Sequence, residues 1–87
     1  MPQVFIPPML RPLTDNRERI ETDAQTVREA IADLDTQFPG FASRLCLDDN
    51  LRPEIAVAID GKISPRGLRQ KLTADCEVHF LPAIGGG

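Results

Sequence analysis

The groups in this chain best suited to chemistry lie at its carboxyl end, where residues 82–87 read Pro-Ala-Ile-Gly-Gly-Gly. Glycine loses more conformational freedom on ordering than any other residue, so three glycines in a row are unfavourable inside a packed element. They are, however, thin enough to pass through a narrow channel in another protein. The terminal carboxylate of Gly87 is therefore the candidate reactive group.

The residues that precede Gly87 could carry this carboxylate away from a folded body. The last six residues of the chain reach about 20 Å when extended. Pro82 fixes φ and lacks an N–H, so sheet hydrogen bonding can end there. Ala83, Ile84, Gly85 and Gly86 follow it. We expect residues 1–82 to form one domain and the remaining five to form a flexible tail that enters the active site of a partner.

Other side chains do not assemble into a conventional active site. The only histidine, His79, alternates outward on an expected strand without a Ser or Cys beside it at catalytic spacing. Asp33 and Asp35 are two residues apart on an expected helix and so point to different faces. Asp48 and Asp49 lack the spacing of a calcium loop. We therefore expect no metal site and no enzymatic activity in this chain.

Composition excludes several classes of partner. The 87 residues carry a formal net charge of −3 and 41% hydrophobic side chains. They can bury one modest core. The negative charge would repel a phosphate backbone, so we expect no nucleic-acid partner. No apolar run approaches the roughly 18 residues of a membrane span, and the first residues lack the features of a signal peptide. We expect a cytoplasmic protein without membrane contact.

The two cysteines, Cys46 and Cys76, are too few and too far apart in sequence for a metal cage or a disulfide framework. Buried cysteine commonly behaves as a small apolar side chain. We interpret both as core residues.

One helix is clearly indicated by capping and periodicity. Thr26 and Glu29 have the spacing of a capping box. Apolar residues then recur at helical spacing, and Pro39 and Gly40 provide a stop signal. The residues of this apolar stripe are Val27, Ala30, Ile31, Leu34 and Phe38. A helix over residues 26–38 with a single apolar stripe needs a sheet or another helix to cover it.

Alternating apolar residues predict the strands. A first strand begins at Val4 and meets Pro7 and Pro8, where it should bend before Met9 and Leu10 resume it. Its antiparallel return is expected near Ile20. Further strands are predicted over residues 55–60, near residue 63 after a tight Asp-Gly turn at 60–61, and over residues 76–81.

These elements predict an α+β domain, with one main helix across one face of a mixed sheet of four to five strands. If Val57 and its alternating neighbours Ile55 and Ile59 face the helix, the opposite face must meet solvent or a partner. We expect this face to carry Ala56, Ala58, His79 and Leu81. The small alanines would leave a level surface for docking.

The chain resembles the ubiquitin-like sulfur-carrier family, which includes the small subunit of molybdopterin synthase and the thiamine sulfur carrier. The matching segments are the opening strand, the helix from Thr26, the hairpin around residues 60–61 and residues 77–84 leading to the final glycines. Residues 6–14 and 80–87 look most like the carrier that serves a cysteine synthase. The resemblance implies a β-grasp fold.

The resemblance also implies a mechanism. A ubiquitin-activating-type adenylating enzyme would use its own ATP and Mg²⁺ to adenylate Gly87, which would then become a thiocarboxylate. A second partner would accept the sulfur: a cysteine synthase, the large subunit of molybdopterin synthase, or a thiazole synthase. This chain would bind no cofactor itself and would act as a protein co-substrate. One departure is Asp75-Cys76, where the family often has Gly-Asp before the last strand.

Two other functions fit the same sequence. A ubiquitin-like modifier would use the same adenylate but would be conjugated through Gly87 to lysines of other proteins. A non-reactive interaction module could share the fold, with the glycines no more than a frayed end. The sequence leaves these alternatives open, and it leaves open which pathway would receive the sulfur.

Overall fold

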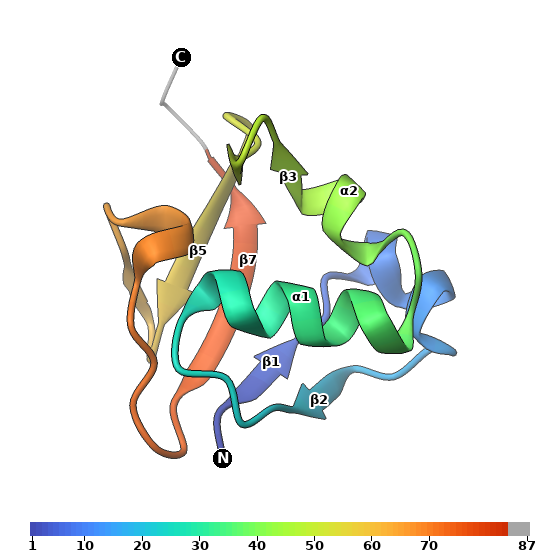
Figure 1. The fold of residues 1–87 in the computed structure, drawn as a ribbon, viewed down its shortest axis with the longest axis horizontal. Coiled ribbons are helices and arrows are strands. Elements are labelled where there is room, and N and C mark those ends of the chain that lie inside the picture. The colour runs from blue at the N-terminus through green and yellow to red at the C-terminus, as the bar shows by residue number, and fades with distance from the viewer. Residues whose placement is uncertain (84–87) are drawn as a thin grey trace.

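The computed structural model describes residues 1–83, and its centre is a mixed five-stranded sheet with a helix across one face (Figure 1). The strand order is β2-β1-β7-β5-β6. The strands are β1 (Gln3–Phe5), β2 (Arg19–Glu21), β5 (Ile55–Ile59), β6 (Lys62–Ile63) and β7 (Glu77–Pro82). Within residues 1–83, only β1 and β7 pair in parallel. The predicted α+β, β-grasp architecture is confirmed.

The main helix, α1 (Val27–Gln37), starts as predicted. The Thr26 hydroxyl accepts the N–H of Glu29 at 3.1 Å. The Glu29 carboxylate accepts the N–H of Gln25 at 3.1 Å, one residue before the cap. The buried residues of α1 are Val27, Ala30, Ile31 and Leu34. Capping and periodicity therefore locate both the start of this helix and its buried side.

Replacing the helix cap gives a stability test. Thr26→Ala leaves the Glu29 N–H without its acceptor, and we expect the free energy of unfolding to fall by about 1 kcal/mol. Thr36→Ala is the matched control. Thr36 lies on the exposed side of α1, and its hydroxyl donates only to the Ala32 carbonyl one turn earlier. Its effect should stay within about 0.5 kcal/mol. Urea titrations followed by circular dichroism measure both, and equal losses would contradict the capping role.

The connection from β1 to β2 differs from the prediction. Met9 and Leu10 do not resume the strand, because a 3₁₀ helix, η1 (Pro8–Thr14), follows Pro7. Proline suits the first positions of a helix, where no intrahelical N–H bond is needed. Leu10 is buried in the core, whereas Met9 is 78% exposed. The two prolines therefore end the strand by starting a helix, and not by bending the strand.

The second half of the chain adds shorter elements. Gly40, at φ +99°, precedes helix α2 (Phe41–Leu45), which leads into a small hairpin of β3 (Cys46–Leu47) and β4 (Asn50–Leu51). Asp60 and Gly61 both have positive φ, as a tight primed turn requires, and β6 pairs back on β5. A second 3₁₀ helix, η2 (Gly67–Arg69), brings the buried Leu68 to the core. The predicted hairpin is confirmed.

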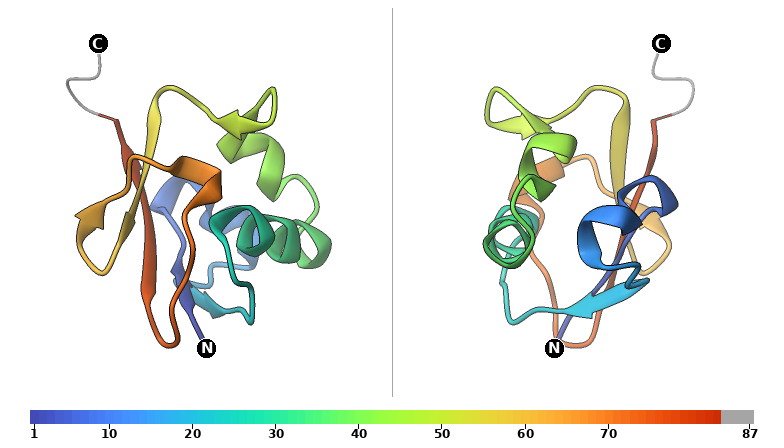
Figure 2. Two further views of the ribbon diagram at one scale, coloured as in Figure 1. Left: turned by 60° about the vertical axis from the view of Figure 1, so that its left-hand side comes forward. Right: turned by 90° about the vertical axis from the view of Figure 1, so that its right-hand side faces the viewer.

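The core lies between the sheet and the helices. Val4, Val57 and Val78 come from the sheet and are fully buried, as is Phe41 of α2. Figure 2 shows α1 and α2 on one side of the sheet. No helix or strand within residues 1–83 covers the other face of the central strands. Among residues 1–83, no helix is long and apolar enough to cross a membrane.

Candidate functional site

The four predicted docking residues lie together on the uncovered face of the sheet. In the β5–β7 ladder, Ala56 pairs with Leu81 and Ala58 pairs with His79. Directly paired side chains share a face. The intervening pair, Val57 and Phe80, belongs to the buried core, so the other two pairs point away from α1. The structure brings the four residues together, and their role in docking stays a prediction.

Neighbouring strands widen this surface with apolar side chains. Phe5 of β1 pairs with His79 and stacks on its ring, with ring centroids 4.2 Å apart and an interplanar angle of 13°. Ile63 of β6 pairs with Ala58 and is 64% exposed. Leu81 is 38% exposed. We call this surface the open face and define it by Phe5, Ala56, Ala58, Ile63, His79 and Leu81.

One residue of the predicted face contributes little exposed surface. Ala58 is only 3% exposed and offers almost no surface of its own. Its cross-strand neighbours are His79 on one side and Ile63 on the other, and both are larger. Ala58 therefore forms the floor of the open face, whereas Leu81, Ile63 and the edge of His79 provide the surface.

The environment of His79 does not resemble a catalytic site. Its Nε2 lies 3.3 Å from Oε1 of Glu77, and its ring stacks on Phe5. No nucleophilic side chain takes part in these contacts. The structure is consistent with a histidine that belongs to an interaction surface.

A groove with basic walls borders the open face. It has a volume of about 690 Å³, and Phe5, His79 and Leu81 line it. The basic residues at this groove are Arg11, Arg17 and Arg19. Glu18 also lines this groove, and Arg17 precedes β2, so strand alternation does not separate these charges. Sequence reasoning missed the three arginines because Arg11 comes from η1 and meets the other two only in the folded chain.

The end of β7 leads toward the predicted reactive group. Pro82 still pairs with Ile55, and the Ala83 N–H donates to the Glu54 carbonyl at 2.9 Å. The strand thus continues one residue beyond its predicted end at Leu81. Pairing between β1 and β7 stops at His79, so the missing N–H of Pro82 lies where β7 has only one neighbour. Ile84, Gly85, Gly86 and Gly87 lie outside the described residues.

A second groove, which is mostly apolar, lies next to the end of β7. It has a volume of about 560 Å³ and is lined by Leu81 and Pro82 from β7 and by Pro7, Met9 and Leu10 from the β1–β2 connection. Met9 is the most exposed of the large apolar side chains in residues 1–83. Apolar surface therefore continues from the open face around the segment that leads to Gly87.

The carboxylates excluded as a catalytic pair have structural partners. Asp33 Oδ2 accepts the hydroxyl of Thr22 at 2.8 Å. Asp35 Oδ1 accepts the N–H groups of Gly40 and Ala42 at 3.2 and 2.9 Å, and so caps the start of α2. Both interactions serve the fold.

The cysteines are not activated nucleophiles in this structure. Cys76 is 1% exposed and belongs to the core, as predicted. Cys46 is half-buried and packs against the core. Burial raises the pKa of the Cys46 thiol, although Arg28 and Arg52 oppose this change. Within residues 1–83, no three His, Cys, Asp or Glu side chains are grouped to hold a metal ion.

Comparison with known proteins identifies the family. The sequence matches the ThiS family over residues 4–87. A chain in the crystal structure of the Amycolatopsis orientalis BexX/CysO complex is 29% identical, with a TM-score of 0.88 and full coverage of both chains. SAMP1 from Haloferax volcanii is 26% identical, with a TM-score of 0.71 over 99% of this chain and 98% of that one.

Mycobacterium tuberculosis CysO, described as an antigen, has the same fold, with a TM-score of 0.86 and 24% identity over 97% of this chain and all of that one. A search of curated proteins found no match. Because the family match covers nearly the whole chain, this protein belongs to the ThiS family of ubiquitin-like β-grasp proteins.

Proposed function

We propose that this chain is a sulfur carrier whose Gly87 is activated and thiolated by partner enzymes. The observation that carries the proposal is the family match, which continues through the final glycines to residue 87. The apolar open face supports it, because Leu81 lies on the same strand that leads to those glycines. A docked partner would thus lie beside the reactive end.

The proposed chemistry takes place in the partners. A free carboxylate is a poor electrophile, so an adenylating enzyme with its own ATP and Mg²⁺ joins the Gly87 carboxylate to AMP and releases pyrophosphate. A sulfide-equivalent nucleophile then attacks the carbonyl carbon and displaces AMP, which leaves a thiocarboxylate. This chain contributes the carboxyl group and the docking surface, and it acts as a co-substrate without catalysing a step.

The second partner is the enzyme that takes the sulfur. The similarity to a CysO chain crystallised with BexX supports a carrier that docks on a separate protein. A cysteine synthase is the favoured acceptor because of the resemblance in residues 6–14 and 80–87. The large subunit of molybdopterin synthase and a thiazole synthase are the alternatives.

A mass measurement tests the proposal. The purified chain is incubated with the cognate adenylating enzyme, ATP and a sulfur donor, and the intact chain is then weighed. A carrier gains the mass difference between sulfur and oxygen, and omission of ATP abolishes this gain. An unchanged mass in the complete reaction would contradict the proposal.

A protein modifier is the second candidate function, and the similarity to SAMP1, a small archaeal modifier protein, favours it. A modifier would form an isopeptide bond between Gly87 and lysines of other proteins. Incubation with the adenylating enzyme and ATP in cell extract would then yield branched peptides that carry the chain's carboxyl end. Thiocarboxylate without such adducts would support the carrier alone.

The open face gives a further test of docking. Leu81→Glu places a charge in the middle of this apolar surface, and we expect the KM of the adenylating enzyme for the chain to rise about tenfold or more, because a desolvated, unpaired charge opposes association. Leu47→Glu is the matched control, since Leu47 is 48% exposed on β3, outside the open face. Equal KM values for the two variants would contradict docking through this face.

A further inference from the structure

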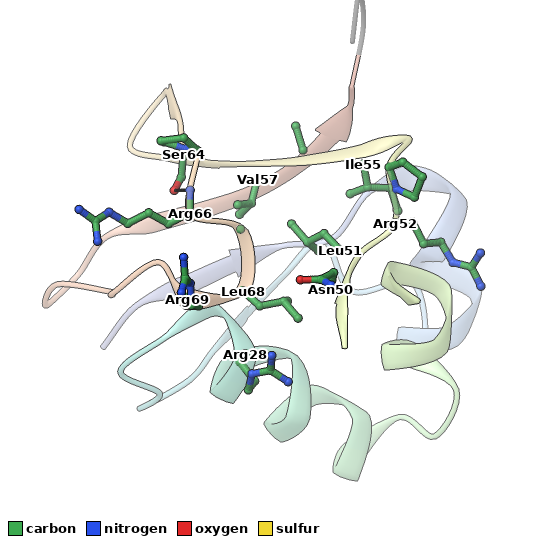
Figure 3. Close-up of a pocket in the computed structure, with 14 residues that line it drawn as sticks. Arg28, Asn50, Leu51, Arg52, Ile55, Val57, Ser64, Arg66, Leu68 and Arg69 are labelled. Carbon is green, nitrogen blue, oxygen red and sulfur yellow. Dashed lines mark hydrogen bonds between the residues drawn. The ribbon is translucent and has the colours of Figure 1, made fainter. Parts of the chain in front are cut away.

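We propose that a second surface, on the helix side of the sheet, binds an acidic segment of a partner protein. Four arginines and an apolar floor line a cleft of about 550 Å³ there (Figure 3). We call it the arginine cleft and define it by Arg28, Arg52, Arg66, Arg69, Leu51, Val57 and Leu68. The cleft goes beyond the proposed function, because neither the carboxyl end nor the open face needs it.

The fold gathers these arginines from separate parts of the chain. Arg28 comes from α1, Arg52 follows β4, and Arg66 and Arg69 flank Gly67 at η2. In Figure 3 the side chains of Arg28 and Arg69 lie near Leu68, the side chain of Arg66 extends outward, and that of Arg52 extends away from Leu51 toward α2. Val57 and Leu68 are anchored in the core, so the floor of the cleft is held in place.

The positive charge of the cleft is not neutralised by ion pairs within residues 1–83. In this part of the chain, the close contacts between a basic and an acidic group join the Met1 amine to Asp75 and the His79 ring to Glu77, and none involves an arginine of the cleft. Arg28 donates to the backbone carbonyl of Asp49 at 3.1 Å, and not to its carboxylate. This concentration of unpaired guanidinium groups occurs in a chain whose net charge is −3.

The four arginines of the cleft differ in the hydrogen bonds that their guanidinium groups make within the chain. Arg52 donates from Nε and Nη2 to the Ser43 carbonyl at 3.3 and 2.9 Å, which leaves further N–H groups free. Arg66 and Arg69 are exposed. Their guanidinium groups donate no hydrogen bond to the described part of the chain. Guanidinium forks bind carboxylates in a bidentate manner, so Arg28, Arg66 and Arg69 can donate to acidic side chains, whereas the guanidinium of Arg52 is directed toward α2.

The apolar residues at the base of the cleft favour an acidic peptide over phosphate or nucleic acid as its ligand. A phosphate group or a nucleic-acid backbone would leave the half-buried Leu51 uncovered. Val57 and Leu68 are already buried and form only the base beneath it. The net negative charge also opposes nucleic acid. A peptide with acidic and apolar side chains would pair with the arginines around the cleft and would also cover the apolar surface at its base. The cleft also borders Ile55 and Ala56, which pair with Pro82 and Leu81. A partner segment bound here would therefore lie close to the end of β7.

A peptide titration tests the cleft without any sulfur chemistry, so its result does not depend on the proposed function. The isotope-labelled chain is titrated with a synthetic peptide of alternating Glu and Leu and, separately, with a peptide in which Gln replaces Glu. Amide NMR shifts locate the binding surface. We expect shift changes at Leu51 and residues 66–69 with the acidic peptide only, and weaker binding as salt screens the charges.

Charge variants complete the test. Arg66→Glu with Arg69→Glu should weaken peptide binding about tenfold or more, and the milder pair Arg66→Gln with Arg69→Gln should weaken it less. Arg17→Glu with Arg19→Glu is the matched control at the open-face groove and should bind as the unchanged chain does. The proposal is overturned if the peptide does not bind, if the Gln peptide binds equally well, if the shifts map to the open face, or if inorganic phosphate competes as strongly as the peptide.

Discussion

Deletion of Gly87 is expected to abolish thiocarboxylate formation by the cognate adenylating enzyme, with a loss of at least about a hundredfold in rate. The shortened chain still ends in a carboxylate, on Gly86, but that group falls one residue, about 3.5 Å, short of the reacting position. Misplacement of a reacting group by even 1 Å can reduce a rate by about a hundredfold. Intact mass measured over time in the complete reaction gives the rate.

Two controls make this result specific. Gly85→Ala keeps the length of the chain and should retain most of the activity unless the partner's channel excludes a methyl group at that position. The Gly87 deletion should also unfold at the same urea concentration as the full chain, because the removed residue lies beyond the described sheet. If partner-dependent sulfur transfer survives the deletion and neither chain gains a thiocarboxylate, the carrier proposal is wrong and the non-reactive interaction module becomes the better hypothesis. Thiocarboxylate formation at an undiminished rate on the shortened chain would show that Gly87 is not the required reacting residue.

Phe41→Ala should lower the free energy of unfolding by about 3–5 kcal/mol. Phe41 is fully buried in α2, within the same core as the apolar stripe of α1. Its removal leaves a cavity in a domain whose total stability is expected to be about 5–15 kcal/mol. Urea unfolding monitored by circular dichroism measures the loss, and we expect the midpoint of unfolding to move to a clearly lower urea concentration.

Phe38→Ala provides the comparison for this core substitution. Phe38 is the cap residue of α1, and it is only partly buried against the same core. Its truncation removes less contact area, so its effect should be clearly smaller than that of Phe41→Ala. A loss at Phe38 equal to or greater than that at Phe41 would show that the core lies closer to the end of α1 than the structure indicates.

The elements that the sequence predicts well are those whose signals are local. Thr26 and Glu29 identify the start of α1 because both partners of the cap lie within one helical turn. Asp60 and Gly61 identify the β5–β6 hairpin because both positions require positive φ, which few residue types tolerate. Alternation at Val78 and Phe80 identifies the buried side of β7 for the same reason, since neighbours in sequence determine it.

The missed features depend on contacts between distant residues. Pro7 and Pro8 can end a strand or start a helix, and the burial of Leu10 in the core favours the helix. Ala58 is buried because His79 and Ile63 flank it across two strand pairings.

The arginine cleft has no sequence signature, since its arginines are spread over residues 28–69 and meet only in the folded chain. The role of Gly87 rests on family resemblance and on chemistry, because the structure describes residues 1–83.

The central position of β7 has a mechanical consequence. This strand pairs with β1 on one side and with β5 on the other, and its far end leads to Gly87. A pull applied along β7 loads both hydrogen-bonded ladders in shear, so many bonds resist together. If the proposed partners bind the carboxyl end, withdrawal of that end should leave the two ladders of β7 intact.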